Sequence, residues 1–464
     1  MVGTVTWLAG EVLRNFKAGK SVACCNGLLV SEAFRRIFGR LVSGCQSAPG
    51  PVGRWPKRLT AWLVRKAPTQ RQAGGSRTVI KPDLNQEAHA QAAQSAAALT
   101  HPKAMKPNVT LLAAALLAGL FLTGSQRPPA EKGLKDYYQS YFPVGVAVSP
   151  QALRNPVESA LILQHFNSVT PENAMKMGPI HPEENRYNWA DADAIVDYAQ
   201  AHKLRVRGHN LCWHEQTPKW LFTDAQGKTV SKEVLLKRLH DHIDAVVKRY
   251  KGKLYAWDVV NEAIADNSGE FLRNSDWYKI CGEDFIAEAF RYAHAADPDA
   301  VLFYNDYNTE RPEKRERVYR LLKKLKDAKV PIDAVGLQGH WSLHEPTEQE
   351  LRATIERFAS LGLKVQITEL DVSVYPWEKE RRARRAGESD AYTPELEQKQ
   401  AAQYKMFFKV FRDYKNVLTG VTFWNISDKY TWLDTYPVAG RKNYPLLFDQ
   451  NQQPKKAFYE VVKF

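Results

Sequence analysis

The sequence predicts an α/β protein in which residues 130–464 form a single (β/α)8, or TIM, barrel. Apolar runs with the composition of strands alternate with helical patterns from Gly145 onward, as parallel βαβ units require. Eight such runs occur in about 335 residues, a length that suits one barrel with some long loops. Polar and aromatic residues follow almost every run, as expected where the carboxyl ends of barrel strands meet.

The strand candidates are short runs rich in Val, Leu, Ile and aromatic residues, a composition that suits buried strands. In chain order they are residues 144–148, 168–170, 204–208, 254–260, 301–304, 334–338, 363–368 and 420–424. Between them, amphipathic spacing predicts helices at residues 234–249, 284–296, 313–328 and 348–361. A parallel barrel brings the carboxyl ends of all its strands to one rim, so the residues that follow these strands are expected to meet.

The basic character of the chain belongs to its first 104 residues. They hold 15 of the 65 Lys and Arg but only 4 of the 51 Asp and Glu, so the other 360 residues are nearly neutral. The overall charge is therefore poor evidence for a nucleic-acid partner, and none is expected. Residues 1–104 show Gly, Pro and Ser clusters and no sustained core periodicity, so we expect a basic extension of low structure.

Residues 105–126 have the pattern of a signal peptide. Met105 and a lysine precede an apolar run of 12 residues, which is too short to cross a bilayer but fits an export signal. Ser125 stands where a lipoprotein signal needs Cys, so no stable membrane anchor is expected. Because export signals work at a free N-terminus, we expect translation to start at Met105, residues 1–104 to be an over-extended start, and the domain to be periplasmic or secreted.

Neither disulfides nor cofactors are expected in the predicted barrel. Its two cysteines, Cys212 and Cys281, are too few for a disulfide framework and are interpreted as buried thiols. No phosphate-binding Gly-rich loop, no H-E-x-x-H sequence and no metal-spaced Cys/His cluster occurs, so no cofactor or metal is predicted. The protein is expected to be a monomer.

Two strand candidates end near a glutamate. The first is followed by Asn261 and Glu262, and the second by Glu369. Because the fourth and seventh strands face each other across a barrel mouth, the two carboxyl groups are expected to form a pair, and glycoside hydrolysis is the commonest chemistry of such a pair. A strand-end glutamate is more often a structural ion-pair partner, but Asn261 beside one member favours catalysis. Sequence does not give their separation, so retention and inversion both stay open on this evidence.

Seven motifs in chain order cover essentially the whole predicted barrel. They are Ser168-Val-Thr-Pro-Glu-Asn-Ala-Met-Lys176, Arg207-Gly-His-Asn-Leu-Cys-Trp-His-Glu-Gln216, Trp257-Asp-Val-Val-Asn-Glu262, Asn305-Asp-Tyr307, Gly336-Leu-Gln-Gly-His340, Ile367-Thr-Glu-Leu-Asp371, and Thr422-Phe-Trp424 with Trp432. With these motifs, residues from about 140 to 464 resemble glycoside hydrolase family 10, the endo-1,4-β-xylanases. The resemblance implies retaining endo-hydrolysis of β-1,4-xylosidic bonds, with xylan and xylo-oligosaccharides as the substrates.

The resemblance also implies a role for individual residues. It makes Glu262 the general acid/base and Glu369 the nucleophile, with His340 hydrogen-bonded to Glu369, Asp371 orienting that histidine, and Asn261 holding the 2-hydroxyl of the reacting sugar. The residues implied to bind sugars on the non-reducing side of the scissile bond are Glu172, Asn173, Lys176, His209, Trp213, Gln216 and Gln338. Those implied to flank the reacting sugar or to shape the acceptor side are Trp424, Trp432 and Tyr307. Glu262 is expected to have a raised pKa, since a general acid must stay protonated near neutrality.

Two positions depart from the family pattern and affect only the fine shape of the cleft. Met177 stands where the family often has Trp, and Asn425 where Gly is common. Taken alone, a strand-end Trp is more often core than sugar platform, and His214 is interpreted as structural. The charged stretch 377–398 is expected to be a loop on the active face, where a charge run is usually solvated surface. A weaker hypothesis is that its four arginines contact acidic substituents of a polymeric substrate.

Two other functions stay open. One is a related barrel glycosidase acting on β-1,4-glucan or mixed-linkage glucan, which the resemblance at Gln216 and the two loop tryptophans disfavours. The other is a catalytically silent xylan-binding protein, which the presence of both carboxyl groups disfavours.

Overall fold

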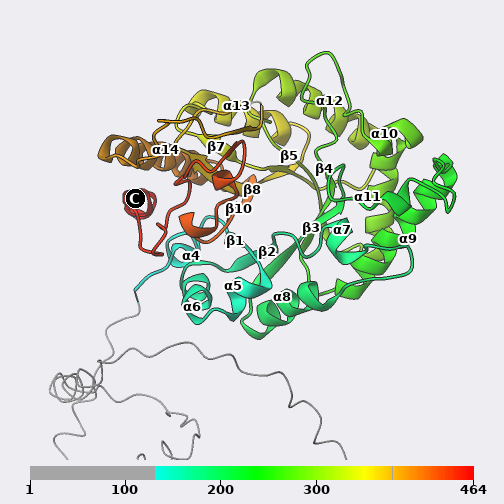
Figure 1. Ribbon diagram of the computed structural model, residues 1–464, viewed down its shortest axis with the longest axis horizontal. Coiled ribbons are helices and arrows are strands. Elements are labelled where there is room, and N and C mark those ends of the chain that lie inside the picture. The colour runs from blue at the N-terminus through cyan, green and yellow to red at the C-terminus, as the bar shows by residue number, and fades with distance from the viewer. Residues whose placement is uncertain (1–130, 379) are drawn as a thin grey trace, which may run out of the picture. The chain divides into compact units, whose positions relative to one another are not determined.

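The computed structural model describes residues 131–378 and 380–464. The expected basic extension and signal peptide lie outside these residues. Eight parallel strands close into a barrel, and helices surround it (Figure 1). The predicted barrel architecture is therefore confirmed. Within the described part of the chain, no helix is long and apolar enough to cross a membrane.

The barrel strands follow one another in chain order, and each pairs in parallel with the next. They are β1 (Val144–Val148), β2 (Ser168–Pro171), β3 (Arg205–Cys212), β4 (Ala256–Asn261), β5 (Val301–Asp306), β6 (Ala334–Leu337), β8 (Lys364–Ser373) and β10 (Leu418–Phe423). The last strand pairs with both β8 and β1, which closes the ring. All eight predicted strands are present, but β3 and β8 run four to five residues further than predicted toward the rim.

The four predicted helices agree with the structure to within two residues at each end. They are α9 (Lys232–Tyr250), α11 (Asp284–Ala296), α12 (Pro312–Asp327) and α13 (Glu348–Ala359). The other helices are α4 (Leu134–Tyr137), α5 (Pro150–Arg154), α6 (Pro156–His165), α7 (Met177–Ile180), α8 (Ala190–Ala201), α10 (Asp276–Cys281), α14 (Pro394–Asp413) and α15 (Lys456–Val462). Side-chain caps begin several of them, as at α13, where Thr347 and Glu350 form a capping box.

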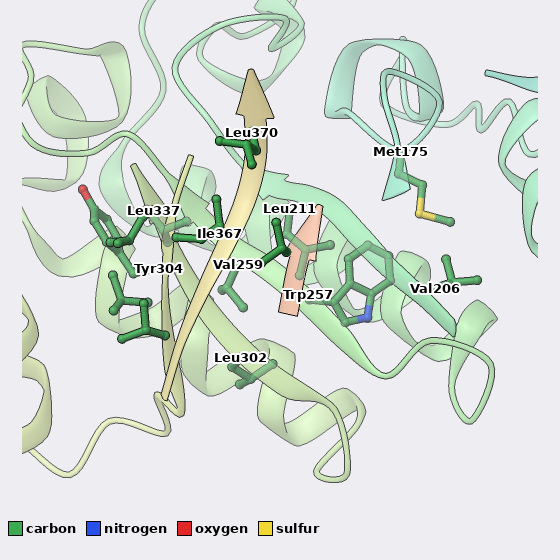
Figure 2. Close-up of a cluster of buried hydrophobic side chains, with 14 of the residues drawn as sticks. Met175, Val206, Leu211, Trp257, Val259, Leu302, Tyr304, Leu337, Ile367 and Leu370 are labelled. Atoms are coloured by element: carbon green, nitrogen blue, oxygen red, sulfur yellow. The ribbon is translucent and has the colours of Figure 1, made fainter. Parts of the chain in front are cut away.

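The core joins the strands to one another and to the helix layer. Figure 2 shows side chains from β3, β4 and β8 in one buried cluster, among them Leu211, Trp257, Val259 and Ile367. Trp257 is 1% exposed and lies directly over Gly208, where an added Cβ would come 2.1 Å from its Cε3 atom. Glycine is therefore required at 208 by the close approach of the tryptophan ring from the neighbouring strand.

A short second strand follows β6 and extends the rim beside β8. This strand, β7 (His340–Ser342), pairs with the outer end of β8 from Asp371 to Ser373. Between β6 and β7 the backbone turns at Gly339, which has a φ of 80° and no room for a Cβ beside Ile367. The turn lets Gln338 and His340 both present side chains at the rim.

The stretch 377–398 is only partly the loop predicted from its charges. Its last residues belong to α14, because Thr393 caps that helix and Pro394 occupies its first position. Earlier in the stretch, β9 (Arg382–Ala383) pairs in parallel with β11 (Val438–Ala439), which lies in the loop after β10. A small two-stranded sheet thus joins two loops of the active face.

Candidate active site

Every predicted site residue lies at the carboxyl-end rim of the barrel. Glu262 directly follows β4, whereas Glu369 lies within β8, which continues for four more residues. The prediction that the second strand ends just before Glu369 was therefore wrong. The strand continues because its outer end pairs with β7.

Glu262 is buried and held by three donors. The indole N–H of Trp213 donates to Oε2 at 2.8 Å, and the amides of Gln338 and Asn261 donate to Oε1 at 2.8 and 3.0 Å. Burial raises the pKa of Glu262, and the charge of Asp306 raises it further, against the lowering effect of the hydrogen bonds. The raised pKa agrees with the expectation for a general acid.

Glu369 is also buried, but its pKa is shifted in the opposite direction from that of Glu262. Burial pushes its pKa upward, but the neighbouring His209, the hydrogen-bonded His340 and the Arg207 guanidinium outweigh burial and lower the pKa to about 2. The His340 ring donates from Nε2 to Glu369 Oε2 over 3.3 Å, and Asn305 donates to Oε1 over 2.8 Å. Glu369 is therefore ionised under the conditions in which Glu262 is protonated.

His340 is held between two carboxylates. Its Nδ1 atom donates to Asp371 Oδ2 at 2.9 Å, while Nε2 faces Glu369. Burial lowers the pKa of His340, but the two carboxylates outweigh burial and raise it to about 10. The indole of Trp432 also donates to Asp371 Oδ2, at 2.8 Å, which orients the carboxylate. His340 is thus a cation aimed at Glu369.

Asn305 connects the hydrogen bonds around Glu262 with those around Glu369. The sequence motifs had assigned it no role. Its amide N–H groups donate to Asn261 Oδ1 and to Glu369 Oε1, both at 2.8 Å. The Thr368 hydroxyl donates to the side-chain oxygen of Asn305, Oδ1, at 2.7 Å and so sets the orientation of the amide. Its place in a motif directly after a strand was the signal that could have found it.

Arg207 was also missed as a functional residue. It is fully buried beneath the rim, donates to the Thr368 carbonyl at 2.8 Å, and lies 3.8 Å from Asp258. Asp258 in turn accepts from His209 Nδ1 at 2.8 Å. A buried arginine in a strand that opens a polar motif was the available signal.

Lys176 lies beside two tryptophans of the rim, Trp213 and Trp424. Its ammonium donates to Asn173 at 3.0 Å and lies 5.0 Å from the Trp213 ring centre and 6.0 Å from that of Trp424. Burial lowers the pKa of Lys176, although Glu369 and Glu172 oppose this effect. Burial also raises the pKa of Glu172.

The remaining candidates occupy different surroundings. Gln216 is exposed, and its backbone carbonyl accepts from Gly178 at 2.7 Å. The Tyr307 hydroxyl donates to Asp266 at 2.6 Å. His214 places Nδ1 3.9 Å from Glu262 Oε2, and burial lowers its pKa to about 4.

The two cysteines of the barrel form no disulfide with each other. Cys212 and Cys281 are buried free thiols, as predicted. Residues 131–378 and 380–464 hold no group of three or more His, Cys, Asp or Glu side chains placed to bind a metal ion.

Comparison with known proteins identifies the family. The sequence model of Glycosyl hydrolase family 10 matches residues 133–464. The chain belongs to glycosyl hydrolase family 10. It is 51% identical over 331 residues to a β-1,4-xylanase of Dictyoglomus thermophilum, covering 71% of this chain and 90% of the relative. Family 10 thus accounts for the entire barrel.

Solved structures of family 10 enzymes superpose on the barrel. A xylanase from Paenibacillus barcinonensis, crystallised with a conduramine derivative, has a TM-score of 0.69 and 45% identity over 72% of this chain and 99% of that chain. A mutant protein in complex with xylotriose also gives a TM-score of 0.69, with 44% identity over 72% of this chain and 100% of that chain.

The family 10 departure at Asn425 has a structural consequence. Asn425 adopts a φ of 121°, a conformation that side chains disfavour and glycine tolerates. We expect Asn425→Gly to raise the free energy of unfolding by about 1 kcal/mol, because the relieved strain exceeds the added entropy of the unfolded chain. Denaturant unfolding of the two proteins measures this difference. Unchanged or lower stability would mean that the side chain of Asn425 compensates the strain.

Two of the four arginines of the charged stretch have ion-pair partners within it. Arg382 donates to Glu378 at 2.6 Å and to Glu388 at 2.8 Å. Arg384 pairs with Asp390 at 2.8 Å. These two arginines therefore hold the loop together, and the hypothesis of substrate contact narrows to the other two.

Proposed function

We propose that this protein is an endo-1,4-β-xylanase that hydrolyses internal β-1,4-xylosidic bonds of xylan with retention of configuration. The observation that carries the proposal is a pair of buried carboxyl groups at one rim, one with a raised and one with a lowered pKa. Opposite protonation states are what double displacement requires of its two carboxyl groups. The β-1,4-xylanase relative supports xylan as the substrate.

In the first step, Glu369 attacks the anomeric carbon and forms a glycosyl–enzyme ester. The bond from that carbon to the glycosidic oxygen breaks, and Glu262 transfers its proton to the departing oxygen. The leaving chain gains a free hydroxyl group. Glu262 is then ionised, and Glu369 is esterified.

In the second step, water replaces the leaving chain. Glu262 removes a proton from the water as its oxygen attacks the anomeric carbon, and the ester bond to Glu369 breaks. Glu262 is protonated again and Glu369 is a free carboxylate. Two displacements at one carbon return the original β configuration.

The neighbours of the two carboxyl groups serve these steps in distinct ways. The His340 cation, oriented by Asp371, keeps Glu369 ionised and aimed. Asn261 is hydrogen-bonded to both Glu262 and Asn305, and we assign its amide to the 2-hydroxyl group of the reacting sugar. Gln338 orients Glu262 through its hydrogen bond to Oε1.

The sugar-binding residues divide between the two sides of the scissile bond. We assign the non-reducing side to a set of polar and aromatic residues, namely Glu172, Asn173, Lys176, His209, Trp213, Gln216 and Gln338. We assign Trp424 and Trp432 to the reacting sugar, and their positions 6.3 and 4.9 Å from the His340 ring support this assignment. Tyr307 lies on the acceptor side. The xylotriose complex of the related structure supports xylo-oligosaccharide binding in such a cleft.

Reducing ends released from xylan and from carboxymethyl-cellulose test the proposal. We expect rapid release from xylan, a mixture of oligosaccharides early in the reaction, and little release from the cellulose derivative. Faster release from the cellulose derivative would support the glucan-active alternative. Binding to xylan without any release would support the silent binding protein.

Two exposed arginines are proposed to contact acidic side groups of xylan. Arg381 adjoins Arg382, whose backbone N–H donates to Pro437 at 2.9 Å in the loop after β10, and neither Arg381 nor Arg385 has an ion-pair partner among the described residues. Replacing both by glutamine is expected to raise KM on glucuronoxylan about two- to fivefold, the effect of exposed ion pairs. KM on unsubstituted xylan should stay unchanged.

Arg384→Gln is the matched control, because Arg384 is exposed but pairs within the loop. If the double variant and the wild type have the same KM on glucuronoxylan, the proposed contact of Arg381 and Arg385 with acidic side groups is contradicted.

We also propose that the protein is exported from Met105, acts as a monomer and carries no stable membrane anchor. The sequence of residues 105–126 supports export. The N-terminal sequence of the exported protein tests the start, and a mature chain that retains residues before Met105 would overturn it. Sedimentation of the purified protein tests the monomer.

A further inference from the structure

Arg273 lies on the acceptor side of the site, in the segment that follows Glu262. Its guanidinium donates to acceptors from three places: the backbone carbonyl of Glu262 at 3.1 Å, Asp266 at 3.1 Å and the Tyr307 hydroxyl at 2.9 Å. Tyr307 also donates to Asp266 at 2.6 Å, which closes a ring of three side chains. The planar donor group of arginine suits such a set of acceptors.

The backbone of Glu262 needs this support. Its φ of 57° lies in the left-handed region, which is unfavourable for a non-glycine residue and persists only where surrounding contacts enforce it. The N–H of Glu262 donates to the Asn305 carbonyl at 2.9 Å. Its carbonyl oxygen accepts from Arg273, so both polar groups of the residue are held.

The charges around Arg273 are arranged to keep it in place. Burial pushes the pKa of Asp266 upward, but Lys314, Tyr307 and Arg273 outweigh burial and lower it to about 2. Lys314 lies 3.6 Å from the Tyr307 ring centre and 2.8 Å from Asp306. Since Asp306 raises the pKa of Glu262, the same network holds the acid's backbone and one source of its raised pKa.

We propose that Arg273 is a positioning residue for the general acid. It fixes the left-handed backbone of Glu262 and thereby aims the carboxyl proton at the glycosidic oxygen. This inference rests on the proposed function of Glu262. Arg273 acts through Glu262 and Tyr307, so its loss should affect proton donation to the leaving group more than attack by the nucleophile.

The alternative is that Arg273 merely ties down the segment after β4. Arg317 provides the comparison, because its Nη1 atom donates to the carbonyls of Ala265, Asn267 and Glu270 at 2.6, 3.0 and 2.8 Å. Arg317 lies in α12 and holds the same segment through three hydrogen bonds. Those bonds include neither Glu262 nor Tyr307. Arg317→Lys is therefore the matched control for Arg273→Lys.

The experiment compares kcat/KM on xylan with kcat/KM on a dinitrophenyl β-xylobioside, whose leaving group departs without protonation. The value of kcat/KM reports only the steps up to formation of the glycosyl–enzyme ester, in which Glu262 acts as an acid. Arg273→Lys is expected to lower kcat/KM on xylan about 10²-fold, as small misplacements of catalytic groups do. On the activated substrate, the loss should stay below about threefold.

A second variant guards against general misfolding. Asp266→Asn removes the negative charge beside Arg273 and replaces one carboxylate oxygen by an NH2 group, at a position that is 45% exposed, and we expect a smaller loss with the same dependence on the leaving group. Equal losses on both substrates in Arg273→Lys, or the same dependence in Arg317→Lys, would overturn the proposal. If the wild-type protein releases no reducing ends from xylan, the proposed function fails instead.

Discussion

Glu369→Gln is expected to lower kcat/KM on xylan about 10⁶-fold, the effect of removing a catalytic nucleophile. The amide has nearly the same shape as the carboxylate, so the fold is expected to persist, although its single oxygen can accept from Asn305 or from His340 but not from both. It cannot form the glycosyl–enzyme ester. Because the pKa of Glu369 is lowered to about 2, loss of wild-type activity on acidification should come from another group until the pH approaches that value.

Glu369→Ala with added azide distinguishes the role of this residue from that of a structural ion pair. Azide in the vacated space should attack the anomeric carbon once and give an α-glycosyl azide from an activated β-xylobioside. NMR of the product measures its configuration. Activity on xylan within about tenfold of the wild type, with no effect of azide, would contradict nucleophilic catalysis by Glu369.

Glu262→Gln is expected to lower kcat/KM on xylan by about 10² to 10⁴, the range for general acid–base catalysis. On a dinitrophenyl β-xylobioside the loss should be small, because that leaving group needs no proton. In the wild type, activity on xylan should fall as the pH rises through the raised pKa of Glu262, since the acid form is then lost. This alkaline limb should be absent from Glu262→Gln on the activated substrate.

Glu310→Gln is the matched control for the pH profile. Glu310 is a buried glutamate whose pKa burial also raises, and it makes none of the hydrogen bonds that join Glu262 to Glu369. Its replacement should leave the alkaline limb unchanged. If the limb survives in Glu262→Gln and disappears in Glu310→Gln, the assignment of the general acid is wrong.

The positions of the strands and of both glutamates were predictable because they depend on local pattern. Alternation of apolar and helical segments predicted eight strands and four helices, and the side chains of Ser231 and Thr347 cap two of those helices where they begin. The charged stretch 377–398 was less predictable, because Thr393 and Pro394 begin a helix inside a run that otherwise lacks apolar periodicity. Charge alone does not distinguish a solvated helix from a loop.

The sequence by itself determined the barrel, the family resemblance and which residues reach the rim, since strand order and direction follow from local patterns along the chain. Only the tertiary structure decided how those residues act on one another. Gln338 donates a hydrogen bond to Glu262, which lies 76 residues away in the sequence. Asn305 donates one to Glu369, which lies 64 residues away. The direction of each pKa shift depends on burial and on such distant neighbours. For that reason, the division between an acid at 262 and an ionised carboxylate at 369 is a property of the folded molecule.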